Sequence, residues 1–150
     1  MPGKKVMAFG TFDMLHKGHE YFLRESRKRG DEIVVVVARD ATVKKVKGRL
    51  PSEGENERLE KVKTLGYVSK AVLGSRGSDK LEVVRRERPD VICVGYDQEH
   101  FIGPLKDEFP EMPIIRIGPF WPQKYKTSII KAGKRRKLPA NHIININHER

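Results

Sequence analysis

The sequence predicts an open α/β fold, with one domain built around a mainly parallel sheet. Two observations carry this prediction. Apolar runs such as "EIVVVVA" (32–38) and "DVICVG" (90–95) are nearly continuous, as in strands that are covered on both faces. Amphipathic segments lie between these runs, and such strand–helix alternation favours parallel strands joined by right-handed crossovers.

Five apolar runs are expected to form strands, over residues 6–10, 32–38, 70–74, 90–95 and 113–118. Four amphipathic segments are expected to form helices, over residues 19–30, 56–66, 79–89 and 127–137. Gly30 and Gly66 stand where two of these helices would stop, and Asp79 with Glu82 has capping-box spacing. The order of these elements predicts a single-domain, Rossmann-like open sheet over residues 1–132. A basic C-terminal tail, 133–150, follows, and the sequence leaves its order open.

Composition limits the class of protein. The chain has 150 residues and a formal net charge of +11, with 37% hydrophobic and 34% charged residues. A strongly positive balance attracts anions, whether nucleic acids or phosphorylated metabolites. No apolar run approaches the roughly 18 residues of a membrane span, and the N-terminus lacks a signal-peptide pattern, so we expect a cytoplasmic protein. The lone cysteine, Cys93, excludes an internal disulfide and is expected to be a small buried hydrophobe.

The segment "GTFDMLHKGH" (10–19) is the main functional feature. It leaves the first expected strand at its carboxyl end, where ligands bind in open α/β sheets. Gly10 lets the backbone turn close to a ligand, and Gly18 leaves room for a phosphate at the start of the following helix. His16 and His19 lie three residues apart, so both rings can face the same phosphate oxygens. The spacing predicts a phosphate site at the first strand–helix junction.

Two other interpretations of this segment stay open at the level of the residues. The histidines could be surface residues of an ordinary strand–helix turn. Alternatively, His16, His19 and Asp13 could hold a metal ion, although the usual zinc spacings are missing. The dinucleotide fingerprint G-x-G-x-x-G and the P-loop pattern are both absent.

The "GTFD" and "HKGH" parts together resemble the signature of the nucleotidyltransferase superfamily with an H-x-G-H motif, over about residues 5–132. The resemblance implies transfer of AMP or CMP from a nucleoside triphosphate to a small phosphate ester, with Mg²⁺ or another divalent metal bound to the triphosphate. It implies His16 and His19 as catalytic residues. It also implies a set of nucleotide-binding residues in the same segment: Gly10, Thr11, Phe12, Asp13, Lys17 and Gly18. A homodimer is a further implication that the residues leave open.

Basic residues after the second strand resemble the family's phosphate-binding segment. "ARDATVKKVKGRLP" (38–51) is similar to the corresponding part of archaeal FAD synthases, and Lys44, Lys45 and Lys47 are candidates to neutralise phosphate charge. Side-chain direction prevents all three lysines from facing one ligand. Arg58 matches a basic residue that closes on the phosphates in cytidylyltransferases, so we expect Arg58 to bind phosphate.

Two later segments resemble the remaining family motifs. "VGYDQ" (94–98) is similar to the G-x-D segment beside the nucleotide, which makes Asp97 a candidate partner of the ribose or base. "KYKTSII" (124–130) is similar to the final motif, in which hydroxyls at a helix start hold phosphates. Thr127 and Ser128 fit that role, and Tyr125 is placed to pack on the nucleotide. The glycine and second hydroxyl pair of the cytidylyltransferase form are absent.

These features favour a flavin adenylyltransferase that uses ATP and FMN and produces FAD and pyrophosphate. The alternative is a cytidylyltransferase acting on CTP and glycerol-3-phosphate or another small phosphate ester. A basic nucleic-acid-binding protein and a non-catalytic nucleotide sensor are the remote alternatives. No RNA-binding signature accompanies the "KRRK" run (134–137).

Overall fold

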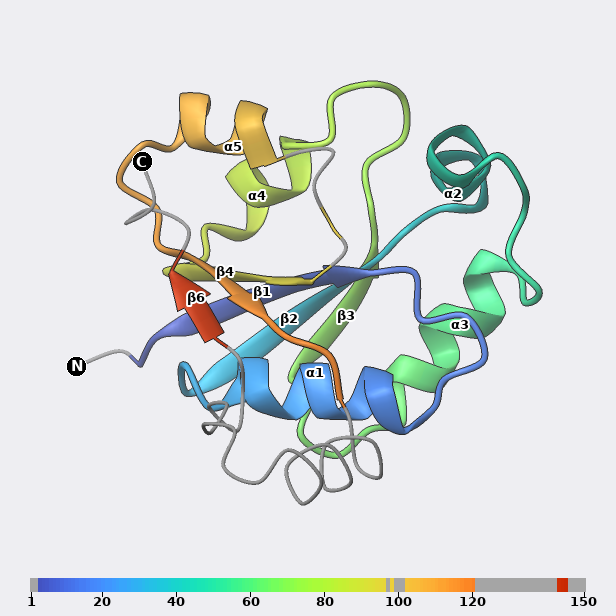
Figure 1. Ribbon diagram of the computed structural model, residues 1–150, viewed down its shortest axis with the longest axis horizontal. Coiled ribbons are helices and arrows are strands. Elements are labelled where there is room, and N and C mark those ends of the chain that lie inside the picture. Colours follow the sequence, from blue (N-terminus) through green and yellow to red (C-terminus); the bar gives the residue numbers. More distant parts are fainter. Residues whose placement is uncertain (1–2, 97, 99–101, 121–142, 146–150) are drawn as a thin grey trace, which may run out of the picture.

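A six-stranded sheet forms the centre of the computed structural model, which describes residues 3–96, 98, 102–120 and the backbone of 143–145. The strand order is β3-β2-β1-β4-β5-β6 (Figure 1). All pairs from β3 to β5 are parallel, and β6 pairs antiparallel with β5. The strands are β1 (Lys5–Gly10), β2 (Glu32–Val37), β3 (Lys70–Leu73), β4 (Val91–Gly95), β5 (Ile114–Ile117) and β6 (Ile143–Asn145).

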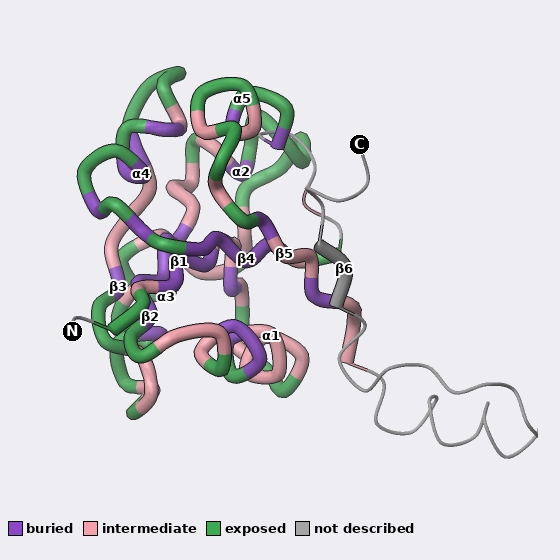
Figure 2. The backbone as a smooth tube through the Cα atoms, turned by 90° about the vertical axis from the view of Figure 1, so that its left-hand side faces the viewer, coloured by how far each residue is buried: buried purple, intermediate pink, exposed green. Residues whose placement is uncertain are grey.

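Helices follow the strands and cover both faces of the sheet. They are α1 (Lys17–Arg27), α2 (Asp40–Lys47), α3 (Glu55–Lys63), α4 (Glu82–Glu87) and α5 (Ile102–Glu108). Helices α1 and α3 lie on one face, and α4 and α5 lie on the other (Figure 1). Figure 2 shows the buried strands between these layers. No helix in the described ranges is long and apolar enough to cross a membrane.

The core has two halves because successive strand residues point to opposite faces of the sheet. Val34 and Val36 of β2 belong to the cluster beneath α4 and α5. Val35 and Val37 of the same strand belong to the cluster beneath α1 and α3. Burial on both faces explains why the β2 run is apolar at every position from 33 to 37.

The expected fold class is confirmed, and each predicted strand is present with boundaries shifted by one residue at most. Helix α4 starts at Glu82, later than predicted, because Asp79 accepts a hydrogen bond from the Leu81 N–H and binds Arg85 instead of capping a helix. Helices α2 and α5 and strand β6 were not predicted. Part of the expected tail therefore pairs with the sheet at residues 143–145. The predicted helix over 127–137 lies outside the described residues.

The strand order reverses between β1 and β4. The chain continues from β1 to β2 and β3 on one side, and from β4 to β5 on the other. Connections from β1 and β4 run to opposite halves of the sheet, and this leaves a crevice at the carboxyl ends of the strands. The H-x-G-H segment starts at that edge, directly after β1.

Candidate active site

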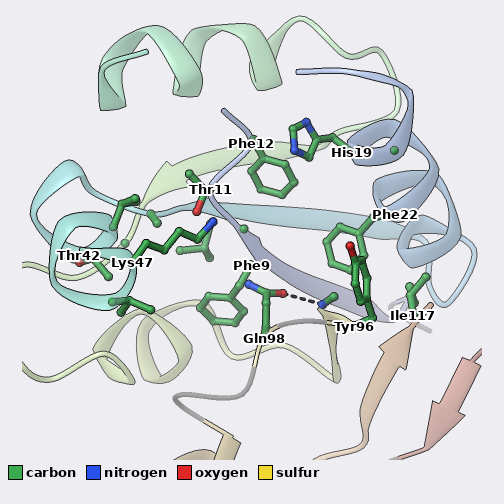
Figure 3. Close-up of a pocket in the computed structure, with 18 of the residues that line it drawn as sticks. Phe9, Thr11, Phe12, His19, Phe22, Thr42, Lys47, Tyr96, Gln98 and Ile117 are labelled. Atoms are coloured by element: carbon green, nitrogen blue, oxygen red, sulfur yellow. Dashed lines mark hydrogen bonds between the residues drawn. The ribbon is translucent and has the colours of Figure 1, made fainter. Parts of the chain in front are cut away.

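A cavity of about 460 Å³ opens at the carboxyl ends of the strands. Its volume lies within the usual range for small-molecule sites. Figure 3 shows Thr42 and Lys47 of α2 on one side, and Phe22 of α1, Tyr96 and Ile117 on the other. Phe9 and Thr11 from β1 and the loop after it lie between the two sides. The segment predicted to bind phosphate supplies Gly10, Thr11, Phe12, His16, Gly18 and His19 to the lining.

His16 and His19 form a reciprocal cap at the N-terminus of α1. The Gly18 N–H donates to Nδ1 of His16 over 3.0 Å, and the His16 N–H donates to Nδ1 of His19 over 3.2 Å. The two rings stack with centroids 3.8 Å apart. A ring nitrogen that accepts a hydrogen bond carries no proton, so each neutral imidazole holds its proton on Nε2. The cap thus fixes both the ring orientations and the tautomers.

The glycine between the histidines is required by this cap. A Cβ at Gly18 would lie 2.9 Å from Cε1 and 3.2 Å from Nδ1 of the His16 ring. A side chain at this position would therefore force the His16 ring to shift from the position in which it caps the helix. The spacing H-x-G-H therefore has a steric cause in this structure, beyond the access that Gly18 gives to a phosphate.

The loop between β1 and α1 is strained and is held by packing. Phe12 and Met14 have φ angles of 54° and 52°, a region that costs non-glycine residues about 1 kcal/mol or more. Phe12 is buried, with its ring edge-on to His19 and stacked near Phe22. A Cβ at Gly10 would lie 2.5 Å from the Phe12 ring. Phe12 therefore acts as a support behind His19 as well as a part of the cavity wall.

Asp13 does not line the cavity, in contrast to its expected role in nucleotide binding. Its carboxylate accepts hydrogen bonds from the backbone N–H groups of Ser52 and Glu53, over 2.8 and 2.9 Å. Burial raises the pKa of Asp13. The two backbone donors and the Arg58 guanidinium together outweigh burial, so the pKa of Asp13 lies below its ordinary value. Asp13 thus clamps the strained loop to the segment before α3. This contact also removes it from a metal site with His16 and His19.

Arg58, expected to bind phosphate, also lies outside the cavity lining. Its side chain is fully buried. The guanidinium donates to the carbonyl of Thr11 over 2.7 Å, to the carbonyl of Glu53 over 2.9 Å and to Oδ1 of Asp40 over 2.7 Å. Asp40 is the first residue of α2, so Arg58 joins the site loop to the helix on the opposite wall. Each of its three nitrogens donates to a partner inside the protein, and the side chain is fully buried, so Arg58 supports the site from behind.

Among the three candidate lysines after β2, only Lys47 lines the cavity. Residues 43, 46 and 47 share one face of α2, because side chains three or four positions apart on a helix lie together. Lys44 and Lys45 are exposed and do not line the cavity. Lys17, at the first position of α1, is also exposed and also lies outside the lining.

Several lining residues were missed by the sequence analysis: Arg39, Thr42, Ser75, Lys80, Tyr96 and Gln98. Arg39 and Ser75 each follow the carboxyl end of a strand by two residues, so the general rule for ligand binding in open sheets could have identified them. Lys80 carries no such local signal. It precedes α4 and reaches the cavity through a contact distant in sequence, in which its Nζ donates to Oγ1 of Thr42 of α2 over 2.9 Å.

The loop after β4 forms the other end of the cavity. Its turn is closed by the Gly95 N–H, which donates to Oε1 of Gln98 over 2.6 Å (Figure 3). Arg116 of β5 donates to the carbonyls of Gly95, Tyr96 and Gln98 over 3.1 to 3.3 Å and ties this loop to the sheet. Asp97, Tyr125, Thr127 and Ser128, the predicted nucleotide-binding residues of this side, lie outside the described residues.

No cluster of three His, Cys, Asp or Glu side chains that could hold a metal ion occurs among the residues that the structure describes. Mg²⁺ commonly uses one or two carboxylates together with phosphate oxygens and water.

An open, mainly parallel sheet with H-x-G-H at its first strand–helix junction defines a nucleotidyltransferase of the Rossmann-like class. The sequence model described as cytidylyltransferase-like matches residues 7–137. The chain belongs to the cytidylyltransferase-like family.

Curated relatives include the FAD synthase of Thermococcus sibiricus, which is 39% identical over 87% of this chain and 88% of the relative. The FAD synthase of Methanothermobacter thermautotrophicus is 50% identical over 70% of each chain. A crystal structure of a lipopolysaccharide core biosynthesis protein from Thermoplasma volcanium superimposes with a TM-score of 0.73 at 40% identity. It covers 80% of this chain and 100% of that one.

Proposed function

We propose that this chain transfers the adenylyl group of ATP to FMN, forming FAD and pyrophosphate. The similarity to proteins named FAD synthase, up to 50% identical, is the observation that carries the proposal. The cavity agrees with it, because one wall is apolar beside cationic side chains. Phe9, Val43, Val46 and Val83 line the cavity together with Lys47. A flavin offers a flat apolar ring and a phosphate, whereas glycerol-3-phosphate has no apolar part to cover these side chains.

The reaction is an in-line displacement at the α-phosphorus of ATP. An oxygen of the FMN phosphate forms the new P–O bond, and the bond from the α-phosphorus to the bridging oxygen breaks, so that pyrophosphate leaves with the electron pair. The phosphate monoester is already ionised, so the step requires no general base. Catalysis depends on holding two anions together and on stabilising the charge that develops on oxygen.

The histidine cap supplies the donors for that charge. Because both Nδ1 atoms accept backbone hydrogen bonds, the Nε2–H groups are the ones that can donate to the α-phosphate and its bridging oxygen. The N-terminal end of α1 adds a favourable potential for an anion. Mg²⁺ bound with the triphosphate would neutralise part of the phosphate charge.

The experiment is to measure pyrophosphate release with ATP and CTP, each against FMN, riboflavin, glycerol-3-phosphate and phosphoethanolamine. We expect turnover with ATP and FMN, with FAD identified by chromatography. Riboflavin is the matched control, because it keeps the ring and lacks the attacking phosphate. Turnover with CTP and a small phosphate ester, without turnover of ATP and FMN, would overturn the choice of substrates. Salt-sensitive binding to random RNA without any nucleotide turnover would support the nucleic-acid alternative instead.

A further inference from the structure

Met14, in the loop between β1 and α1, has a strained backbone that its own side chain does not hold. Its φ angle is 52°, a region that is unfavourable for a residue with a side chain, and its side chain is 58% exposed. Phe12 in the same loop has a similar φ angle but is buried. A strained backbone persists only where the surrounding structure determines it, so Met14 depends on a contact other than packing.

The carboxylate of Glu53 supplies that contact. Its Oε1 accepts a hydrogen bond from the Met14 N–H over 2.9 Å, from 39 residues away in the sequence. Its Oε2 binds Nζ of Lys61 on α3, so the side chain, which is only 13% exposed, has one oxygen for each partner. The hydrogen bonds from Lys61 and from the Met14 N–H lower the pKa of Glu53 below its ordinary value, which keeps the acceptor ionised.

Glu53 also holds this loop through its main chain. Its N–H donates to Oδ1 of Asp13 over 2.9 Å. Its carbonyl accepts a hydrogen bond from Nε of Arg58, and the same guanidinium donates to the carbonyl of Thr11 over 2.7 Å. The N–H, the carbonyl and the carboxylate of Glu53 are therefore all used to fix the loop, two of them directly and one through Arg58.

The fixed loop leads directly into the histidine cap. Leu15 is the one residue between Met14 and His16, whose N–H donates to Nδ1 of His19 over 3.2 Å. Rotation of the backbone at Met14 would turn this N–H away from His19, and hydrogen bonds weaken steeply as their angle departs from linear. Glu53 itself lies outside the cavity lining, so its effect on a ligand would be indirect.

We infer that Glu53 is a positioning residue for the transfer reaction. By holding the Met14 N–H, it keeps His16 and His19 in the cap that leaves both protons on Nε2, where they can donate to the reacting phosphate. The effect on turnover rests on the proposed function, whereas the effect on the cap concerns the free protein and can be measured without substrate.

Three variants separate the contact with Met14 from the other contacts of Glu53. Glu53→Ala removes the acceptor of the Met14 N–H. Glu53→Gln keeps an oxygen that can accept this hydrogen bond and loses the charge that pairs with Lys61. The matched control is Glu57→Ala, which removes a carboxylate of α3 that is 59% exposed and lies 4.0 Å from Nζ of Lys61. The urea midpoint of each variant establishes that it is folded under the conditions of the assays.

The first measurement uses the free protein. Long-range ¹H–¹⁵N NMR spectra at about pH 8.5, where imidazoles are neutral, report which ring nitrogen carries the proton. The signals are assigned by comparison with His16→Ala and His19→Ala. We expect His19 to carry its proton on Nε2 alone in the wild type, Glu53→Gln and Glu57→Ala. Glu53→Ala should show a detectable fraction of the form that is protonated on Nδ1, because the His16 N–H no longer holds that nitrogen as an acceptor.

The second measurement is steady-state turnover of ATP and FMN. Glu53→Ala should lower kcat by about tenfold to a hundredfold, because a misplacement of about 1 Å at the reacting centre can cost that much in rate. The KM for ATP should stay close to the wild-type value, since Glu53 does not line the cavity. Glu53→Gln should restore kcat to near the wild-type value, and Glu57→Ala should match the wild type.

The inference is refuted if the His19 tautomer of Glu53→Ala matches that of the wild type, whatever the rate. A wild-type kcat in Glu53→Ala would also refute it, as would equal losses in Glu53→Ala and Glu53→Gln, which would assign the effect to the ion pair with Lys61. Failure of the proposed function gives a different result. The wild type would then form no FAD, while the tautomers would still report whether Glu53 holds the cap.

Discussion

Replacement of Arg58 tests whether this residue supports the site or binds phosphate. Arg58 is fully buried, and its guanidinium donates to two backbone carbonyls and one carboxylate. The Arg58→Met variant keeps much of the apolar volume and removes all three hydrogen bonds. The Thr11 carbonyl would lose its donor in the strained loop, and Asp40 would lose its ion pair.

The size of the effect follows from these partners. Breaking a buried ion pair by removing one partner costs about 3–5 kcal/mol. Asp40 keeps 35% side-chain exposure, so water can solvate its carboxylate in the variant, and the lower end applies. We therefore expect Arg58→Met to reduce the free energy of unfolding by about 3 kcal/mol. Arg58→Lys keeps the charge and loses at least one hydrogen bond, which should cost roughly 2 kcal/mol.

The assay is urea unfolding at 25 °C without any nucleotide, with Arg49→Met as the control for loss of an exposed arginine. If Arg58 supports the site, its replacement reduces the free energy of unfolding before any ligand is added. A phosphate-binding Arg58 would instead leave the free protein unchanged and raise the KM for ATP. A loss below about 1 kcal/mol in Arg58→Met, together with a raised KM for ATP, would refute the role assigned here.

Three other predictions follow from the site and the core. His16→Ala should lower turnover by roughly two to four orders of magnitude, because it removes a preorganised hydrogen-bond donor from the cavity. The circular-dichroism spectrum should be unchanged, and a wild-type rate would contradict the mechanism. Asp13 has a pKa below its ordinary value in the folded state, so its contribution to stability is complete above about pH 4 and is lost as the pH falls further. The difference in unfolding free energy between wild type and Asp13→Asn should accordingly shrink on acidification, and a constant difference from pH 7 to pH 2 would argue against the clamp. Burial raises the pKa of the Cys93 thiol to about 11, so iodoacetamide should label it far more slowly in native protein than in urea, and equal rates would show that β4 is not buried.

Local sequence signals were sufficient for the five parallel strands and for the position of the H-x-G-H segment at the first strand–helix junction. The apolar run of β2 indicates burial on both faces, which is typical of strands in a parallel sheet that helices cover on both sides. The cap also uses contacts within four residues, since His16, Gly18 and His19 contact one another. Geometry of this kind depends on neighbouring residues in the sequence, so a local motif can predict it. The same reasoning could not place Asp13 or Arg58. Asp13 binds the N–H of Ser52, 39 residues away, and Arg58 binds the carbonyl of Thr11, 47 residues away.

The sequence by itself determined the fold class, the edge of the sheet that carries the site and the two histidines at the helix start. Only the tertiary structure decided which charged residues face the cavity. Arg58 resembles a phosphate ligand in sequence, but packing of α3 behind the loop directs its guanidinium to Thr11, Glu53 and Asp40. Lys80 has no local signal, and the fold brings it to the cavity, where it contacts Thr42, 38 residues away in the sequence. The physical reason is that periodicity sets the direction of a side chain relative to its own helix or strand, whereas packing between elements sets what that side chain meets.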